Sequence, residues 1–263
     1  MTSSSEKQLQ YLKKEKRHRW FVQYSRITIF VLFLALWEFT STVGIIDSFI
    51  FSRPSQIAHC FWNMVLNKSI FLHIGITLYE TMLSFLLVTI LSIFLATILW
   101  FSSKLSEITE PFLVVLNSLP KSALAPLLIV WLGATQTTII VAGMSVALFG
   151  SILNMVTSFQ EVDSDKLKLI YTLNGTKLHV LTKVVFPSSI PSIISNMKVN
   201  IGLCLVGVII GEFLAARQGL GYLIIYSSQV FKLDWLLMSI CILCILAMGL
   251  YTFINLLEKK CNK

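Results

Sequence analysis

Apolar residues occur along the chain in long runs that short polar segments separate. The clearest run, Trp235–Leu256, contains no charged residue and exceeds the roughly 20 residues that a helix needs to cross a bilayer. Within lipid, a spanning segment satisfies its backbone hydrogen bonds internally, which favours helices. The pattern predicts an all-α polytopic membrane protein with about six transmembrane helices. We place the six spans at Ile27–Ile46, Ile76–Phe101, Phe112–Leu132, Thr137–Thr157, Ser188–Phe213 and Trp235–Leu256.

The composition agrees with this prediction. Hydrophobic residues make up 56% of the 263 residues and charged residues only 13%, whereas soluble domains carry about 25% charged residues. The formal net charge of +8 does not indicate a nucleic-acid partner, because cytoplasmic loops of membrane proteins collect Lys and Arg. The chain also lacks a zinc-ligand spacing and an interleaving of basic and aromatic residues.

The distribution of Lys and Arg predicts the orientation of the spans. If the N-terminus lies in the cytoplasm, the inner segments contain fifteen Lys and Arg and the outer segments contain four. This bias predicts that both termini are cytoplasmic. The chain then divides into a basic cytoplasmic segment (residues 1–26), a transmembrane domain (27–257) with a long cytoplasmic loop at about 159–187, and a cytoplasmic tail (258–263). Two outer segments, Asp47–Phe71 and Gly219–Lys232, are apolar enough to form interfacial helices.

The long cytoplasmic loop carries the signals of two short helices. Ser164 or Asp165 can cap the first helix, and Asn174-Gly175 ends it, because both residues tolerate a left-handed backbone. Thr176 can cap a second helix that runs to Phe186 and continues through Pro187 into the fifth span. In that helix, Leu178, Leu181 and Val185 are predicted to share one face, with Val184 beside them. Such a loop either merely connects two spans at the membrane surface or serves as a docking element for a soluble partner.

Four segments then resemble one family in consistent order, from about Trp37 to Leu256. YTLNGTKLHVLTKVVFPSSIP (Tyr171–Pro191) resembles the "EAA" cytoplasmic loop of binding-protein-dependent ABC-importer permeases, most closely those for nitrate, sulfonate, taurine and related small solutes. LPKSALAPLLIVWLGATQTT (Leu119–Thr138) is similar to the family's proline-rich third span. GEFLAARQGLGYLI (Gly211–Ile224) and WEFTSTVGIIDSFIFSRPSQI (Trp37–Ile57) are similar to two further segments.

The resemblance implies a type I ABC importer permease fold and a position in the cell membrane (inner or plasma membrane), in contact with lipid. It implies that the loop is a coupling helix that sits on a separate ATPase. The partners would be two ATPase copies, which bind ATP–Mg, an extracytoplasmic substrate-binding protein and a second permease copy in a homodimer. The chain itself has no G-x-x-x-x-G-K-[ST] phosphate loop, and we expect it to bind no cofactor. The ATPase-coupling residues carried over are Lys168, Tyr171, Leu173, Asn174, Gly175, Thr176, Lys177, Leu178 and Pro187.

Four positions depart from the motif of this loop. Counting back from Pro187, the family's acidic residue falls on Lys168, its two alanines fall on Leu169 and Ile170, and its glycine falls on Asn174. Without the acidic residue, this position offers no carboxylate for a salt bridge to the ATPase. The turn is still expected to form, since Asn accepts the left-handed backbone conformation.

Charged residues within spans are energetically unfavourable and are therefore functional candidates. Lys121 lies between two prolines, where the helix must bend and the backbone must face protein or water. The alternative is that such charges pair with one another or reach the headgroups. Gly207 and Gly211 form a G-x-x-x-G that either packs the chain internally or joins two copies. The pathway candidates are Lys121, Ser122, Glu80, Lys198 and Glu212, with Glu38 as a further charge within a span.

The transport hypothesis has two alternatives. A stand-alone secondary transporter or channel would explain the spans, but the chain shows no internal repeat. A membrane thiol oxidoreductase would use Cys241 and Cys244, which have C-x-x-C spacing, but no neighbouring cation is present to lower the pKa of either thiol. The four histidines show no metal spacing. We therefore predict a permease subunit for a small organic or anionic solute, such as nitrate, a sulfonate, taurine or a vitamin precursor, and we predict that the chain is not an enzyme.

Overall fold

The computed structural model describes residues 2–45, 47 and 51–261. Residues Met1–Trp62 and Asn63–Lys263 form two compact units. Within the described residues, the regular structure is entirely helical. Five helices are long and apolar enough to cross a membrane, and a sixth span is obtained if one bent helix pair is counted as a single span. The prediction of an all-α protein with about six spans is therefore confirmed.

The first unit contains α1 (Thr2–Thr42) and most of α3 (Pro54–Leu66). The predicted boundary between a cytoplasmic segment and the first span, at residue 26, lies inside α1, because the basic segment continues the same helix. Glu38, near the end of α1, accepts hydrogen bonds from the backbone N–H and the hydroxyl of Ser55, at 3.1 and 2.8 Å. Ser55 lies in the first turn of α3, where the helix dipole stabilises a carboxylate. Glu38 thus has a structural partner within this unit.

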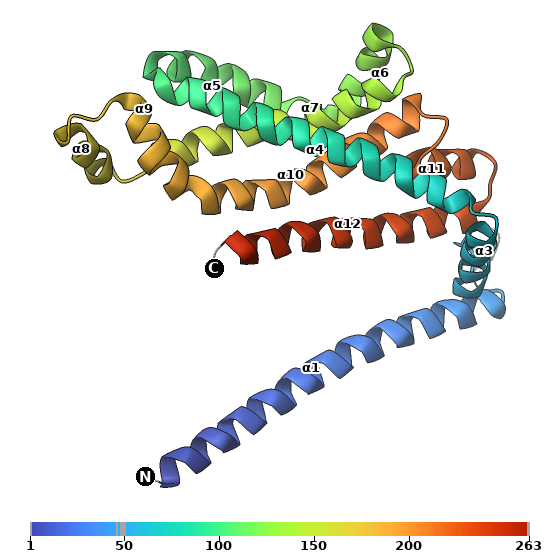
Figure 1. The fold of residues 1–263 in the computed structure, drawn as a ribbon. Coiled ribbons are helices and arrows are strands. Elements are labelled where there is room, and N and C mark those ends of the chain that lie inside the picture. Colours follow the sequence, from blue (N-terminus) through green and yellow to red (C-terminus); the bar gives the residue numbers. More distant parts are fainter. Residues whose placement is uncertain (1, 46, 48–50, 262–263) are drawn as a thin grey trace. The chain divides into compact units, whose positions relative to one another are not determined.

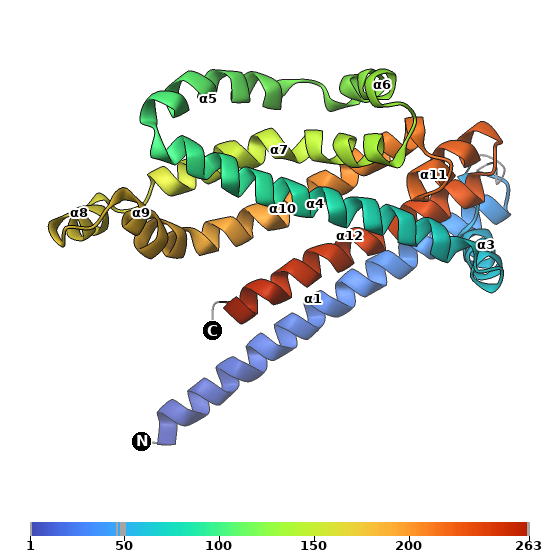
Figure 2. The ribbon, with the colours of Figure 1, turned by 45° about the horizontal axis from the view of Figure 1, so that its top comes forward.

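The second unit is built around α4 (Ser69–Phe101), α7 (Gln136–Gln160) and α10 (Phe186–Ala215), with α7 packed against both of the others. The helix α12 (Leu233–Cys261) packs along α10 and α11 (Leu220–Gln229), and α5 (Ser103–Ser118) and α6 (Lys121–Leu132) pack on α7. The long helices run side by side, with α8 (Ser164–Thr172) and α9 (Lys177–Val180) at one end and α11 at the other (Figures 1 and 2). We call these the α8 end and the α11 end.

Small residues allow α7 and α10 to approach closely. A Cβ atom added to Gly207 would lie 2.8 Å from the Ala142 carbonyl oxygen, and one added to Gly211 would lie 3.0 Å from the Ile139 Cα. Both glycines therefore pack α10 against α7 of the same chain, which is the first of the two alternatives for the G-x-x-x-G pattern.

The predicted third span, Phe112–Leu132, is not one straight helix. It is divided between α5 and α6, which are bent by 95° at Leu119-Pro120. Leu119 and Pro120 have extended backbones, as expected for a proline that cannot continue a helix and for the residue before it. Pro126, by contrast, lies inside α6 and does not break it.

Candidate functional site

The loop at the α8 end has the helix stop that the sequence predicts. Asn174 has the left-handed backbone, with φ of 62°. Its N–H donates to the Tyr171 carbonyl at 3.0 Å, and the Gly175 N–H donates to the Ile170 carbonyl at 2.9 Å. These two bonds form a Schellman motif, in which a left-handed residue ends the helix and satisfies its last carbonyl groups. Asn174 therefore takes the place of the family's glycine in this turn.

Gly175 is required for a different reason from the one we predicted. It is not among the residues with positive φ, so the left-handed conformation does not explain it. Instead, a Cβ atom at this position would overlap the Ile170 side chain and lie 2.7 Å from the Ile170 carbonyl oxygen. The glycine is thus needed for the close approach of the chain to the end of α8.

Caps fix both helices of the loop. The N-cap of α8 is Asp163, whose carboxylate accepts from the Asp165 N–H at 2.9 Å, so the cap lies one or two residues before the predicted positions. Thr176 caps α9 as predicted, and it forms a capping box with His179. Because a cap of this kind contributes about 1 kcal/mol, the four-residue helix α9 has a defined start.

The second helix of the loop differs from the prediction in its winding. After α9, residues Leu181–Val185 form a π-helical turn, η1, which passes directly into α10. The wider turn changes which side chains face inward: Val180 is buried with Leu181 and Val185, whereas Leu178 is 57% exposed. Leu181 and Val185 of the predicted face are therefore buried, and Leu178 is not.

Lys177 ties this loop to a distant helix. Its Nζ donates to the Phe101 carbonyl at 2.6 Å, at the last residue of α4, and it lies 5.5 Å from the centre of the Trp100 ring. A cation at a helix C-terminus is stabilised by the unpaired carbonyl groups there. The loop is therefore joined to α10 through the backbone and to α4 through Lys177.

Several apolar side chains of the loop face outward. Leu173 is 73% exposed, and Leu169 and Tyr171 are also exposed. Lys168, at the position of the family's acidic residue, is exposed and lies 3.0 Å from the Asp165 carboxylate within α8. Pro187 is exposed in the first turn of α10. The loop thus presents an apolar surface on a backbone that caps and turns hold in place.

The α11 end contains a buried network around Glu212. One carboxylate oxygen of Glu212 accepts from the Thr77 hydroxyl of α4 at 2.6 Å, and the other accepts from the Gly221 N–H. The Thr77 oxygen in turn accepts from the Leu220 N–H at 2.8 Å. Leu220 and Gly221 begin α11, so the network satisfies N–H groups that the first turn of a helix leaves unpaired. Glu212 therefore fixes α11 against α4 and α10.

Glycines make room for this carboxylate. A Cβ atom at Gly219 would lie 2.5 Å from the Glu212 carboxyl carbon, and one at Gly221 would lie 2.7 Å from a carboxylate oxygen. Gly219 also has φ of 116°, which side chains rarely permit. The His73 Nδ1 lies 3.1 Å from both the backbone nitrogen and the oxygen of Gly219, so the ring can bond this residue in either tautomer.

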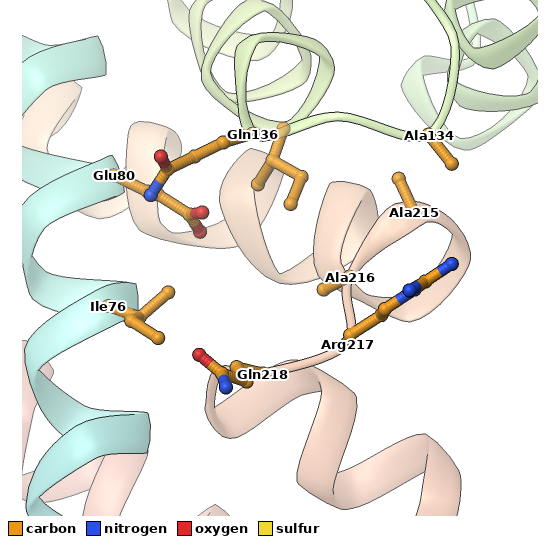
Figure 3. Close-up of a pocket in the computed structure, with 9 residues that line it drawn as sticks. Ile76, Glu80, Ala134, Gln136, Ala215, Ala216, Arg217 and Gln218 are labelled. Carbon is orange, nitrogen blue, oxygen red and sulfur yellow. The ribbon is translucent and has the colours of Figure 1, made fainter.

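Glu80 lies beside this network and lines a cavity of about 330 Å³. Its side chain is 2% exposed, and Figure 3 shows it reaching from α4 toward Gln136, at the start of α7. Arg217 and Gln218, on the loop after α10, lie on another side of the cavity. Glu80 also interacts with Glu212, so two of the predicted pathway residues are brought together at this end.

Two of the other pathway candidates, Lys121 and Lys198, have partners of their own. The Lys121 Nζ donates to the Leu116 carbonyl at 2.7 Å, across the bend between α5 and α6. Lys198 forms an ion pair with Glu258 near the end of α12. Lys198 therefore agrees with the alternative that a charge within a span pairs with another charge. Ser122 is exposed on α6.

Sequence reasoning missed the partners of these groups. Thr77 and Gly221 are distant from each other in sequence, and only the glycines after a glutamate in GEFLAARQGLG hinted at a buried carboxylate. It also missed the polar residues Ser151, Asn154, Asn196 and Asn200, which lie close together on α7 and α10. Their three- and four-residue spacing within two apolar spans is a signal that would have found them.

No metal centre is evident among the residues that the structure describes. No group of three or more His, Cys, Asp or Glu side chains there is placed to hold a metal ion. Cys241 and Cys244 are free thiols on the exposed side of α12.

Comparison with known proteins finds one matching family and several similar permeases. The profile of the family "Binding-protein-dependent transport system inner membrane component" matches residues 88–261. The putative aliphatic sulfonates transport permease protein SsuC of Bacillus subtilis (strain 168) is 24% identical over 248 residues, which cover 94% of this chain and 89% of that protein. The formylaminopyrimidine transport permease protein ThiX of Halalkalibacterium halodurans is 25% identical, over 73% of this chain and 76% of that protein. The taurine transport system permease protein TauC of Escherichia coli (strain K12) is 20% identical, over 86% and 84%.

Solved structures share the fold. An inward-facing structure of the MetNI methionine ABC transporter aligns with a TM-score of 0.62 and 14% identity, over 76% of this chain and 97% of that chain. The crystal structure of an amino acid ABC transporter with histidines aligns with a TM-score of 0.60 and 17% identity, over 76% and 98%.

Proposed function

Because the chain belongs to the family of binding-protein-dependent transport system inner membrane components, and so is a permease subunit of an ABC importer rather than an enzyme, we propose that the loop at the α8 end is its coupling surface. The observation that carries this proposal is the exposure of apolar side chains on a rigid loop. Leu173 and Leu178 face outward, while capped helices and a Schellman turn hold the backbone beneath them. An exposed apolar surface on an ordered element is a typical partner-binding site.

The loop has two connections through which movement of a partner can reach the spans. The first is the continuous helix from α9 through η1 to α10. The second is the contact of Lys177 with the end of α4. When two ATPase subunits close on ATP–Mg, the loops that they hold move with them. In this mechanism α10 and α4 are displaced together, which opens the pathway on one side of the membrane and closes it on the other.

The remaining parts of the importer follow from this arrangement. The α8 end lies in the cytoplasm, as do both termini, in agreement with the bias of Lys and Arg. Two copies of this chain form the pathway, two ATPase subunits bind ATP–Mg, and a separate binding protein delivers solute at the opposite face. The solute is a small organic or anionic molecule, of the kind named for the relatives above.

Purification of the chain from its native membrane tests this proposal. A tagged chain is solubilised gently, and the proteins that accompany it are identified and quantified. We expect an ATPase in a two-to-two ratio with this chain, and we expect Thr176→Cys, placed in the loop, to crosslink to it. The matched control is Thr135→Cys, because Thr135 caps the start of α7 at the α11 end. Absence of an ATPase even after crosslinking at residue 176 would contradict the proposal.

A further inference from the structure

A second polar cavity lies between α7 and α10, away from the Glu212 network. Its volume is about 280 Å³, and hydroxyl and amide side chains line most of it: Asn154, Thr157, Ser158, Ser192, Ser195 and Asn196. We call this surface the α7–α10 polar face. None of the residues that line the cavity is charged, which distinguishes it from the cavity beside Glu80.

Buried hydrogen bonds hold this face in place from behind. Asn196 is 6% exposed, and its amide nitrogen donates to the Ser151 hydroxyl at 2.9 Å. The Asn200 amide donates to the same hydroxyl at 2.8 Å. The Asn154 amide donates to the Asn196 oxygen at 3.4 Å. The network gives the asparagines fixed orientations, and it leaves Asn154 exposed at the surface of the cavity.

The inner part of this face lies within the helices rather than at their ends. Asn154 precedes the end of α7 by six residues, and Ser195 follows the start of α10 by nine, so both are on the order of 10 Å from those ends at 1.5 Å per residue. Both helices are among the candidate membrane spans. Exposed amide and hydroxyl groups at such a depth are unfavourable against lipid, and they occur where a span faces protein or a water-filled cavity.

The hydrogen bonds within the chain do not satisfy all of these polar groups, so the groups still need protein or water beside them. The Thr157 and Ser158 hydroxyls donate to carbonyl groups four residues earlier in α7, at 3.0 and 2.8 Å, which makes them tolerable in many helices. Asn154 differs, because a carboxamide has two N–H donors and a carbonyl oxygen, more than one bond to Asn196 can satisfy. Its exposure therefore indicates a polar environment on this side of α7.

We propose that the α7–α10 polar face lines the water-filled part of the solute pathway, where a small polar solute is contacted by hydrogen bonds rather than by an ion pair. This proposal rests on the permease function and goes beyond it by naming the wall and its chemistry. Lys198 lies two residues from Asn196, but it is paired with Glu258. A charged solute would therefore keep its charge unpaired at this face, which favours passage over tight retention.

Cysteine labelling of the full transport complex tests the proposal. In a chain whose native cysteines are replaced by serine, Ser195→Cys is introduced on the polar face and Phe94→Cys on α4 as the control. Phe94 is exposed and apolar, and it lies near Ala96, which packs with Met155 at the depth of Asn154. Membrane vesicles of both orientations are treated with a charged, membrane-impermeant methanethiosulfonate, and modification and solute uptake are both measured.

We expect Ser195→Cys to react at least about tenfold faster than Phe94→Cys, because the reactive thiolate forms in water and not in lipid. We also expect the reaction to stop uptake. Equal, slow reaction at both positions would overturn the proposal, as would a disulfide between two copies at residue 195 without labelling, which would show a dry interface. Thr157→Cys provides a second test on α7 if Ser195→Cys fails to assemble. Co-purification of the ATPase with each variant separates these outcomes from failure of the permease function.

Discussion

The two ends of the helical unit differ in which groups they bury and which they expose. At the α11 end, polar groups are buried, and Glu212, Thr77 and the first N–H groups of α11 satisfy one another within the chain. At the α8 end, apolar groups such as Leu173 are exposed on a loop. The comparison teaches that the network around Glu212 is completed by folding, whereas the apolar surface at the α8 end is completed by a partner. Changes at the first end should therefore reduce stability, and changes at the second should reduce coupling.

The largest effect is expected from removing the carboxylate of Glu212. In Glu212→Leu, the Thr77 hydroxyl and the Gly221 N–H lose their acceptor in a buried site. Each of these two unsatisfied groups costs about 1–3 kcal/mol, so we expect the free energy of unfolding to fall by about 2–6 kcal/mol. Thermal denaturation of the purified complex, followed by size-exclusion chromatography, measures this loss. Glu212→Gln, which keeps one acceptor, should lose less, and an unchanged melting temperature in Glu212→Leu would contradict the contrast between the two ends.

A smaller effect is expected from filling the space beside the same carboxylate. In Gly221→Ala, the added methyl group would meet a Glu212 oxygen at 2.7 Å and the Ile209 carbonyl oxygen at 3.1 Å. Overpacking of this kind costs about 1–3 kcal/mol. The matched control is Gly202→Ala in α10, where an added Cβ meets nothing within 4 Å and helix propensity improves by up to about 1 kcal/mol. Melting temperatures that move together in the two variants would show that the space around Glu212 is not constrained.

The sequence predicted the α8 end better than the α11 end, because the α8 end is built from local signals. Asn174 and Thr176 act on their own backbone or on residues within one turn, so their patterns report the turn and the cap directly. The contact of Thr77 with Glu212 spans 135 residues, and no periodicity encodes it. The sequence did not predict the π-helical turn at Leu181–Val185, because its pattern was interpreted with regular α-helical spacing.

The central claim is that the loop at the α8 end is shaped for a partner, and one pair of variants tests it most directly. Gly175→Val would clash with Ile170 and displace the apolar surface, whereas Asn174→Gly keeps the left-handed turn. The measurement is solute uptake per assembled complex, with the melting temperature of the purified permease recorded beside it. We expect Gly175→Val to lose most uptake with little change in melting temperature, and Asn174→Gly to retain uptake. Uptake at the wild-type rate in Gly175→Val would contradict the account.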